Sequence, residues 1–435
     1  MRSPDRPITR SPGADPSRRQ PVHTFYGGAH LFTSATAPRL GALARAALDE
    51  YAPNGAALAR AMGIVEPHPF ADVVRARIVE KLRREPIEDL RVDFEDGYGN
   101  RPDAEEDGHA RSVAEEMANG AGAGTLPPFV GIRIKPMSTE LRSRSLRTMD
   151  LFVTTLAKAM GKRVPANFVV TIPKVMIPAH VTAVVRECAR LERRTGLRAN
   201  TLKLEVMIET PQSILAPDGT SALRALVAAG KGRVVGAHFG VYDYTALCGI
   251  TAAHQHMRHP SCDFARHMMQ VALAQSGVNL SDGGTNVLPA PPHRARAGQT
   301  LTAAQRRENH AVVHRAWKRH FDDVRHSLVN GFYQGWDLHP AQLPSRFAAV
   351  YAFFLSARPA ATARLRAFVD KAAQATLLGD VFDDAATGQG LLNFFGRAVS
   401  SGALTMEEAA ETGLTREELQ GRSFLRIVEG RAGKK

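Results

Sequence analysis

Two carboxylates follow apolar, strand-like runs that are neighbours along the chain. Glu209 comes directly after the run Leu204–Ile208 and precedes Thr210-Pro211, and proline cannot extend a central strand. Asp243 follows the next apolar run, residues 233–240. Mg²⁺ takes oxygen ligands and usually leaves coordination positions for a substrate. Glu209 and Asp243 are therefore candidate ligands of one divalent cation, and the alternative is a pair of solvated loop acids.

Other polar residues also stand at or near the ends of apolar runs. Arg133 lies inside the run 129–136, where a charge is costly unless it is paired or faces a polar pocket. Glu95 and Asp96 close the run 90–97, and Lys174 closes the run 167–175. A lysine at such a position could form a Schiff base with a carbonyl substrate. For Lys174 and also Lys135 we favour the simpler role of counter-ion to the acidic cluster.

The elements that must position these residues alternate between strand and helix patterns. Eight strand-like runs can be counted, at residues 22–26, 90–97, 129–136, 167–175, 204–208, 233–240, 278–284 and 331–340. Alternation of this kind predicts a parallel sheet, and eight units predict a closed (β/α)₈ TIM barrel, an α/β fold with its site at the carboxyl ends of the strands. An open doubly wound sheet is the alternative, but no strand is followed by a GxGxxG turn.

The chain divides into three parts on this interpretation. Residues 1–21 are rich in Arg, Pro, Ser and Asp and are expected to be a disordered tail. Residues 22–357 are expected to form the barrel, which is the catalytic domain, and residues 358–435 a small helical C-terminal region.

The overall composition excludes several classes of protein. The 435 residues carry a formal net charge of +13, but the basic residues are scattered and do not interleave with aromatic ones, so specific nucleic-acid binding is not expected. The three cysteines lack CxxC spacing, which argues against disulfides and structural zinc and favours the cytoplasm. No apolar run is long enough to span a membrane. His254, His256 and His259 are interpreted as loop residues rather than as a zinc site.

The strand-end motifs, taken together and in order, resemble a known family. They are similar to the citrate lyase β subunit-like family, which is grouped with the HpcH/HpaI aldolases and is related to malate synthase and malyl-CoA lyase. The motifs that carry the resemblance are Asp93-Phe94-Glu95-Asp96, Arg133-Ile134-Lys135-Pro136, Ile172-Pro173-Lys174-Val175, Ile208-Glu209-Thr210-Pro211, Phe239-Gly240-Val241-Tyr242-Asp243 and Gly335-Trp336-Asp337-Leu338-His339-Pro340.

The resemblance implies a lyase or aldolase that depends on Mg²⁺ (or Mn²⁺) and acts through an enolate. Glu209 and Asp243 would hold the metal, and Arg133 would stabilise the enolate oxygen. Glu95 and Asp96 would order metal-bound water. Backbone N–H groups at Gly240, Val241 and Tyr242 would receive a substrate carboxylate. The substrate would be a small 2-oxo acid or an acyl-CoA thioester, and the enzyme a homo-oligomer. A non-catalytic barrel that binds a metabolite remains the alternative from another class.

The segment 379–386 carries a further expectation. It looks like the acidic turn that, in thioester-using members of the resembled family, brings a carboxylate over the barrel mouth of a neighbouring subunit. Asp383 would then be the catalytic base. The alternative is that Asp383 or Asp384 caps the helix that follows.

Overall fold

The computed structural model describes residues 19–295, 298–370, 376–378, 381–383, 385–421 and 423–432. Most of the tail predicted for residues 1–21 lies outside this range. The last three residues of that stretch are described, and Arg19 forms an ion pair with Glu85, with 2.6 Å between nitrogen and oxygen. This ion pair holds Arg19 against the rest of the protein, and the disordered tail stays a prediction for the residues before it.

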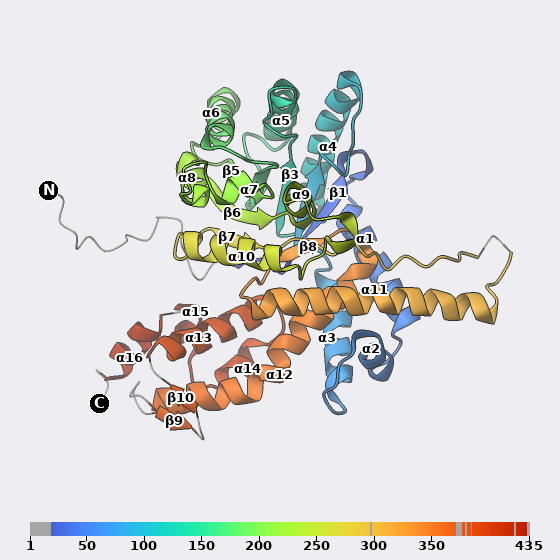
Figure 1. Cartoon of the computed structure of the whole chain (residues 1–435), viewed down its shortest axis with the longest axis vertical. Helices are drawn as coiled ribbons and strands as arrows, with labels where there is room; N and C mark the ends of the chain where they lie inside the picture. The colour runs from blue at the N-terminus through green and yellow to red at the C-terminus, as the bar shows by residue number, and fades with distance from the viewer. Residues whose placement is uncertain are drawn as a thin grey trace.

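Eight parallel strands form the centre of the molecule, as the alternating pattern predicted (Figure 1). They are β1 (His23–Gly28), β2 (Asp89–Asp93), β3 (Phe129–Arg133), β4 (Phe168–Ile172), β5 (Lys203–Ile208), β6 (Val234–Phe239), β7 (Asn279–Ser281) and β8 (Gly335–Asp337). Neighbours in sequence pair in order from β1 to β7, and β8 pairs with β1. The remaining seam between β7 and β8 is joined by a single bridge between Gly284 and Trp336. The result is a nearly closed (β/α)₈ barrel.

Helices surround the barrel and connect its strands. They are η1 (Ala29–Leu31), α1 (Thr36–Tyr51), α2 (Gly55–Met62), α3 (Phe70–Arg84), α4 (Asp103–Ala123), α5 (Arg142–Ala159), α6 (Pro178–Thr195), α7 (Pro211–Ile214), α8 (Ala222–Ala229), α9 (Val241–Leu247), η2 (Ala252–His254), α10 (Pro260–Leu273), α11 (Ala303–Val329) and η3 (Pro340–Gln342). Helix α2 was missed by the sequence reading.

Helix α6 illustrates how the sequence sets these boundaries. Pro178 stands in its first turn, where the missing N–H costs nothing, and Gly196 ends it with a φ of 73°. The residues between them place Val181, Val184 and Cys188 on one buried face, at the three- and four-residue spacing of a helix. These residues belong to the buried hydrophobic core of the molecule.

The C-terminal region is mostly helical, as predicted, and also contains two short strands. Helix α12 (Leu343–Asp370) leads into a two-stranded antiparallel sheet of β9 (Thr376–Leu378) and β10 (Val381–Asp383). The helices α13 (Ala385–Ser400), α14 (Met406–Ala410), α15 (Arg416–Gly421) and α16 (Phe424–Ala432) follow. The boundary proposed at residue 357 falls inside α12, and the division into domains at that point stays a prediction.

The interior of the barrel holds buried charge instead of a purely apolar core. Arg91 on β2 lies 2.7 Å from Asp89 and 2.9 Å from Glu205 on β5, measured between nitrogen and oxygen atoms. Glu205 also accepts a hydrogen bond from Thr171 and faces His238 at 3.3 Å. Burial alone would raise the pKa of Glu205, but Arg91 and His238 bring it down to about 2. We refer to Asp89, Arg91, Glu205 and His238 as the interior cluster.

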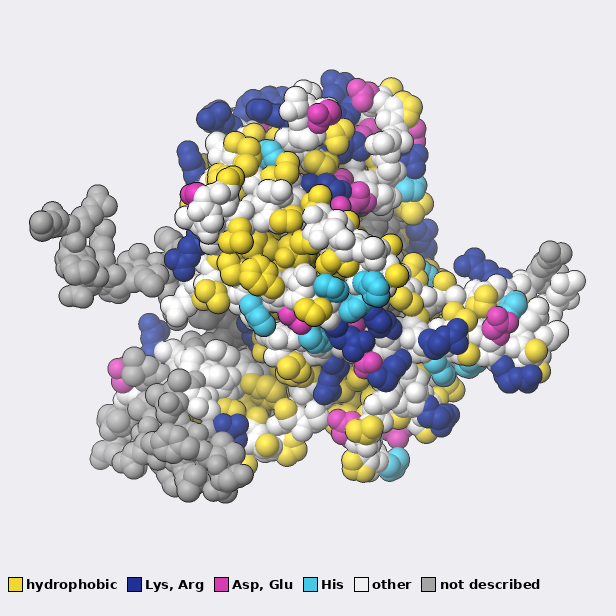
Figure 2. All heavy atoms as spheres, in the orientation of Figure 1, with side chains coloured by type: hydrophobic (Ala, Val, Ile, Leu, Met, Phe, Trp, Pro, Cys, Tyr) yellow, Lys and Arg dark blue, Asp and Glu magenta, His cyan; other side chains and the backbone are white. Residues whose placement is uncertain are grey.

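The outer surface mixes charge with apolar groups. Figure 2 shows Lys and Arg side chains spread over the visible face, with hydrophobic side chains gathered over the region of β6, β7 and α10. Large apolar residues with exposed side chains on α9 and α10 are Leu247, Phe264 and Val271. Among the described residues, no helix is long and apolar enough to cross a membrane. The homo-oligomer stays a prediction.

Candidate active site

One cavity opens at the carboxyl ends of the barrel strands and brings most of the predicted site residues together. Its volume is about 620 Å³. The predicted residues that line it are Asp96, Arg133, Glu209, Gly240, Val241, Tyr242 and Asp243. They come from four separate stretches of the sequence, and the parallel strands carry them to the same end of the barrel. Glu95 is buried beside them and contacts Arg133 and Lys174.

Glu209 and Asp243 differ sharply in their surroundings. Glu209 follows β5 and is 1% exposed, whereas the side chain of Asp243, in the first turn of α9, is 39% exposed. One carboxylate oxygen of Glu209 accepts a hydrogen bond of 2.6 Å from the backbone N–H of Lys174. Burial raises the pKa of Glu209 to about 8, and the negative charges of Asp243 and Glu95 add to the effect. Three carboxylates therefore repel one another at this point.

Such repulsion is what a divalent cation would relieve. Glu95 is buried beside this point, and its Oε2 atom lies 3.0 Å from a terminal nitrogen of Arg133. Those residues contain no group of three His, Cys, Asp or Glu side chains arranged to hold a metal. Mg²⁺ often takes only one or two protein carboxylates and fills its shell with water and substrate. Glu209 and Asp243 fit that mode of binding. The role of Glu95 in ordering metal-bound water stays a prediction.

Arg133 is held at the last position of β3 by carboxylates on the neighbouring strand. It donates to Asp93 through Nε, at 2.7 Å, and through a terminal nitrogen. Its other terminal nitrogen lies 3.0 Å from Glu95. The residue is 5% exposed and lines the cavity. The planar guanidinium is thus fixed in orientation at the wall of the cavity that Glu209 also lines.

Asp93 orders the loop as well as the arginine. Its carboxylate accepts hydrogen bonds from the backbone N–H groups of Glu95, at 2.9 Å, and Gly97, at 2.7 Å. A side chain at Gly97 would crowd this carboxylate, because its Cβ would lie 2.7 Å from an Asp93 oxygen. Asp93 was quoted in the sequence motif but received no role. The period-two alternation of β2, which puts Arg91 and Asp93 on one face, is the signal that could have found it.

Lys174 lies among the acids as the counter-ion that the sequence suggested. Its ammonium group forms ion pairs with Glu95, with Asp96 at 3.2 Å and with Asp243 at 3.9 Å. Burial alone would lower the pKa of Lys174, but Glu95 and the other acids raise it above its ordinary value. A Schiff base requires a neutral amine, so this environment disfavours that chemistry. Lys135 is similarly paired, with 3.2 Å to Glu106.

The backbone of Lys174 has an uncommon conformation. Its φ is 48°, in the left-handed region that residues other than glycine rarely adopt. This conformation follows Pro173 and lets one residue meet two acids, the backbone N–H reaching Glu209 and the side chain reaching Glu95. Local strain of this kind commonly accompanies functional sites.

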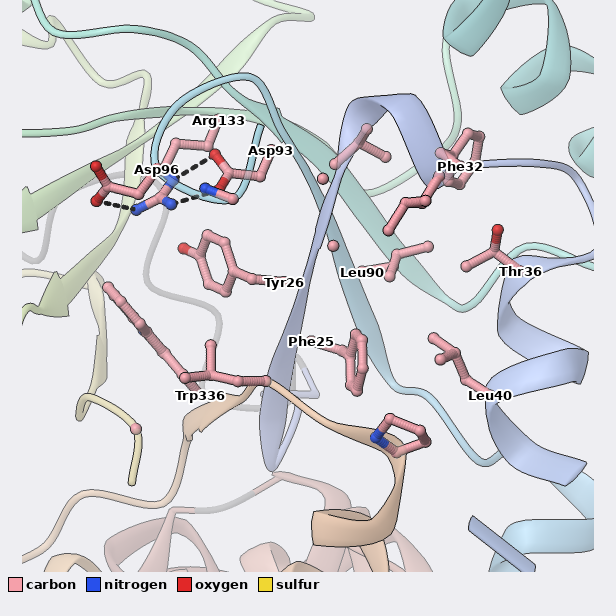
Figure 3. A pocket seen from close by; sticks show the side chains of 18 of the residues that line it. Phe25, Tyr26, Phe32, Thr36, Leu40, Leu90, Asp93, Asp96, Arg133 and Trp336 are labelled. Atoms are coloured by element: carbon pink, nitrogen blue, oxygen red, sulfur yellow. Dashed lines mark hydrogen bonds and ion pairs between the residues drawn. The ribbon is translucent and has the colours of Figure 1, made fainter. Parts of the chain in front are cut away.

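Tyr26 and Trp336 form a wall of the cavity that the sequence reading missed. Their rings lie 4.8 Å apart between centroids, and the Arg133 guanidinium stands 5.0 Å from the centroid of the Tyr26 ring. Figure 3 shows Tyr26 between Trp336 and the Arg133–Asp93 pair. The Tyr26 hydroxyl and the Trp336 indole nitrogen are buried without a hydrogen-bond partner among the described residues.

The backbone groups assigned to a substrate carboxylate are only partly available. The N–H of Gly240 donates to the carbonyl of Ile208 at 3.0 Å, which corrects its assignment as a donor to substrate. Gly240 serves another purpose, since a Cβ there would overlap the Glu209 carboxylate. Helix α9 has no side-chain cap at its start, so its first N–H groups, at Val241 and Tyr242, remain candidates.

Two other predicted residues lie apart from this cluster. His339 caps η3, accepting from the backbone N–H of Ala341, and it does not line the cavity. Asp383 ends β10, and its side chain lies outside the described structure. Helix α13 begins at Ala385, so the residue before it is Asp384, which also lies outside the described residues. In the His-rich segment, His259 caps α10 by accepting from Ser261.

Comparison with known proteins assigns the chain to a family. A family profile described as a domain of unknown function, DUF6986, matches residues 2–427. The chain belongs to this family. No curated protein matches the sequence at a significant level.

Among solved structures, a citrate lyase from Burkholderia xenovorans LB400 superposes with a TM-score of 0.57 at 18% identity, over 79% of this chain and 93% of that chain. A magnesium/glyoxylate complex of Haloferax volcanii malate synthase gives a TM-score of 0.48 at 15% identity, over 94% of this chain and 96% of that chain. At such low identity, the similarity to the citrate lyase concerns the fold alone. The weaker similarity to malate synthase supports no argument about the site.

Proposed function

We propose that this DUF6986 protein is a Mg²⁺-dependent carbon–carbon lyase or aldolase that acts through an enolate, as in the citrate lyase β subunit-like and HpcH/HpaI aldolases. The substrate would be a 2-oxo acid or an acyl-CoA thioester. One observation carries the proposal. Arg133, Glu209 and Asp243 line a single cavity, where a fixed guanidinium and a pair of carboxylates face the same space.

The reaction would break the bond between C2 and C3 of a 3-hydroxy carbonyl unit, counted from the carbonyl carbon. A base removes the hydroxyl proton, the O–H electrons form a new carbonyl, and the electrons of the broken bond become the enolate. Negative charge then grows on the enolate oxygen, and Arg133 is placed to stabilise it. Because Asp93 fixes Arg133 before the reaction, little reorganisation is needed. Mg²⁺ held by Glu209 and Asp243 would supply the second positive charge at this oxygen.

The cavity wall would exclude water from the enolate. Tyr26 and Trp336 cover one side of the space in front of Arg133 with their rings. The acids of the cavity are occupied with Arg133, Lys174 or the proposed metal. The base that starts cleavage is therefore proposed to be Asp383, contributed by a second copy of the chain.

Exchange of pyruvate methyl protons tests this proposal without knowledge of the natural substrate. In D₂O, an enzyme that forms an enolate should replace the C3 protons of pyruvate by deuterium, which proton NMR follows directly. We expect exchange with Mg²⁺, loss of exchange with excess chelator and recovery on adding metal back. Arg133→Lys should slow the exchange strongly, whereas Arg101→Lys, at a residue that does not line the cavity, should not.

Two results would overturn the proposal. The first is a wild-type rate of exchange that chelator does not alter. The second is a lysine adduct trapped by borohydride in the presence of pyruvate, which would establish the Schiff-base route and assign Lys174 the role of the amine.

A further inference from the structure

The cavity continues past β1 to a part where its lining changes character. The charged residues of the cavity lie on the side of β1 that carries Tyr26, together with Arg133. On the opposite side, the outer faces of β1 and β2 face η1 and α1. Figure 3 shows Tyr26 on one side of the β1 ribbon and Leu90, Phe32 and Leu40 on the other. We call this second part the side chamber. The apolar residues that line it are Phe25, Leu31, Phe32, Leu40, Leu90 and Val92.

Gly27 leaves the passage to the side chamber open. A Cβ built on Gly27 would meet no atom within 4 Å, although the residue lies in a strand and lines the cavity. Alternation along β1 places this empty position on the same face as Phe25, and Gly27 pairs with Val92 on β2. Its neighbour Gly28 is different, because a Cβ there would overlap the carbonyl oxygen of Gly97. Gly28 is required by close packing, but Gly27 is not.

A glycine inside a strand weakens the strand, and it often marks a site where a ligand or another part of the backbone approaches closely. The backbone at Gly27 is ordinary strand, so larger residues could adopt it, and the space that they would fill is part of the cavity. The polar side chains on this part of the lining are Thr36 and Arg39 of α1. The rest of this part of the lining is apolar. Such a surface favours a hydrocarbon group, because a polar group would lose its hydrogen bonds to water without gaining others.

The size of the cavity also indicates a ligand larger than a three-carbon acid. Its volume of about 620 Å³ lies within the range of pockets that enclose drug-sized ligands, roughly 300–1,000 Å³. A three-carbon 2-oxo acid bound at Arg133, Glu209 and Asp243 would occupy the polar part and leave the side chamber empty. An unfilled apolar chamber joined to a polar site suggests a longer ligand.

We infer that the substrate carries an apolar arm of several carbons, alkyl or aryl, which lies in the side chamber between β1 and α1 while its carbonyl end lies beside Arg133. The inference rests on the proposed function and adds a substrate class to it, namely acids with a hydrocarbon substituent. Gly27 is the position that selects for the arm, because any side chain there would stand in its path.

Binding of a series of straight-chain 2-oxo acids tests the inference. Isothermal titration with Mg²⁺ would compare pyruvate, 2-oxohexanoate and 2-oxooctanoate. Wild-type affinity should rise by about fourfold for each added methylene that enters the chamber. In Gly27→Leu the ratio of affinities for 2-oxooctanoate and pyruvate should fall to about one. Gly108→Leu is the matched control, since Gly108 is exposed on α4, also has open space around it and does not line the cavity.

A second variant guards against misfolding of the first. Leu40→Trp fills the chamber from the side of α1, and circular dichroism would confirm that each variant is folded. Equal affinity for short and long acids in the wild type would overturn the inference and leave the proposed function intact. A chain-length effect that persists in both filled variants would also overturn it, because the arm would then lie elsewhere. Failure of every 2-oxo acid to bind, pyruvate included, would instead overturn the proposed function in its 2-oxo acid form, and the inference with it.

Discussion

The barrel contains two clusters of buried charge that are built from the same residue types and differ in depth. The interior cluster joins Arg91 to Asp89 and Glu205 inside the barrel. A second cluster lies further toward the carboxyl ends of the strands, and we call it the mouth cluster. Its members are Asp93, Glu95, Arg133, Lys174, Glu209 and Asp243. Arg91 of the interior cluster and Asp93 of the mouth cluster lie on the same face of β2, two residues apart.

The difference lies in what the charges face. Only protein surrounds Arg91, whereas Arg133 lines the cavity. In the interior, Arg91 and His238 bring the pKa of Glu205 down to about 2 against the effect of burial, whereas burial raises the pKa of Asp89 to about 6. At the mouth, burial and neighbouring acids raise the pKa of Glu209 to about 8. Among the acids of the two clusters, only Glu209 combines a raised pKa with a position on the cavity wall, and this combination indicates a place for a cation.

The largest effect is expected at Asp383, which lies in neither cluster. If the mouth acids are all occupied, the base must come from outside the barrel, and loss of a general base typically costs about a hundredfold to ten-thousandfold in rate. Asp383→Asn should therefore abolish measurable turnover without changing the melting temperature. Mixing this variant with an Arg133 variant should restore part of the activity, because each hybrid site would take its two halves from different chains. Wild-type turnover in Asp383→Asn would exclude it as the base.

Arginine substitutions should affect catalysis in the mouth cluster and stability in the interior cluster. Arg133→Lys removes the planar donor at the mouth, so kcat should fall on the order of a hundredfold to a thousandfold, with a smaller change in KM. Arg91→Met leaves Asp89 and Glu205 buried without their partner and should cost about 3–5 kcal/mol of stability in urea unfolding. Turnover per folded molecule should survive that second change. Near-normal kcat in Arg133→Lys would remove this residue from the mechanism.

Glutamate substitutions should separate metal binding from stability. Glu209→Gln keeps the shape and removes the charge, so affinity for Mg²⁺ or Mn²⁺ measured by calorimetry should fall by about a hundredfold or more. Glu205→Gln, four residues earlier on the same strand, should leave metal affinity unchanged and lower the unfolding midpoint. Equal metal affinity in Glu209→Gln and the wild type would show that the metal assignment is wrong.

The smallest effects on metal affinity and stability are expected at Gly240 and Gly236, which lie beside Glu209 and Glu205. In Gly240→Ala the new methyl would lie 2.5 Å from the Glu209 Cβ, so the carboxylate must shift and metal affinity should fall by about tenfold. In Gly236→Ala the closest atom is the Cγ of Glu205 at 3.0 Å, so a small loss of stability and no loss of metal affinity is expected. The reverse pattern would indicate that Glu209 has only a structural role.

Local sequence patterns were enough to predict the barrel and the polar residues at its mouth. Strand runs that stop at proline or glycine, as after Ile208 and Ile134, mark the carboxyl ends where a barrel places its site. The same reading could not find the pairing of Arg133 with Asp93, because such contacts depend on the register between strands. It also missed Tyr26 and Trp336, which meet only where the last strand closes against the first. The interior cluster was missed because alternating polar residues in a strand usually face water.

Helix α12 has a consequence for how the molecule can move. It runs without interruption from the end of β8 into the C-terminal region, a length of about 42 Å for its 28 residues. Arg346 near its start is bound to Asp337 of β8, and Arg358 further along is bound to Glu408 of α14. Pro359 lies inside the helix and lacks the N–H that would complete its hydrogen-bond ladder. Pro359 is therefore the position in α12 at which bending should be easiest, between the end tied to β8 and the part that leads away from the barrel.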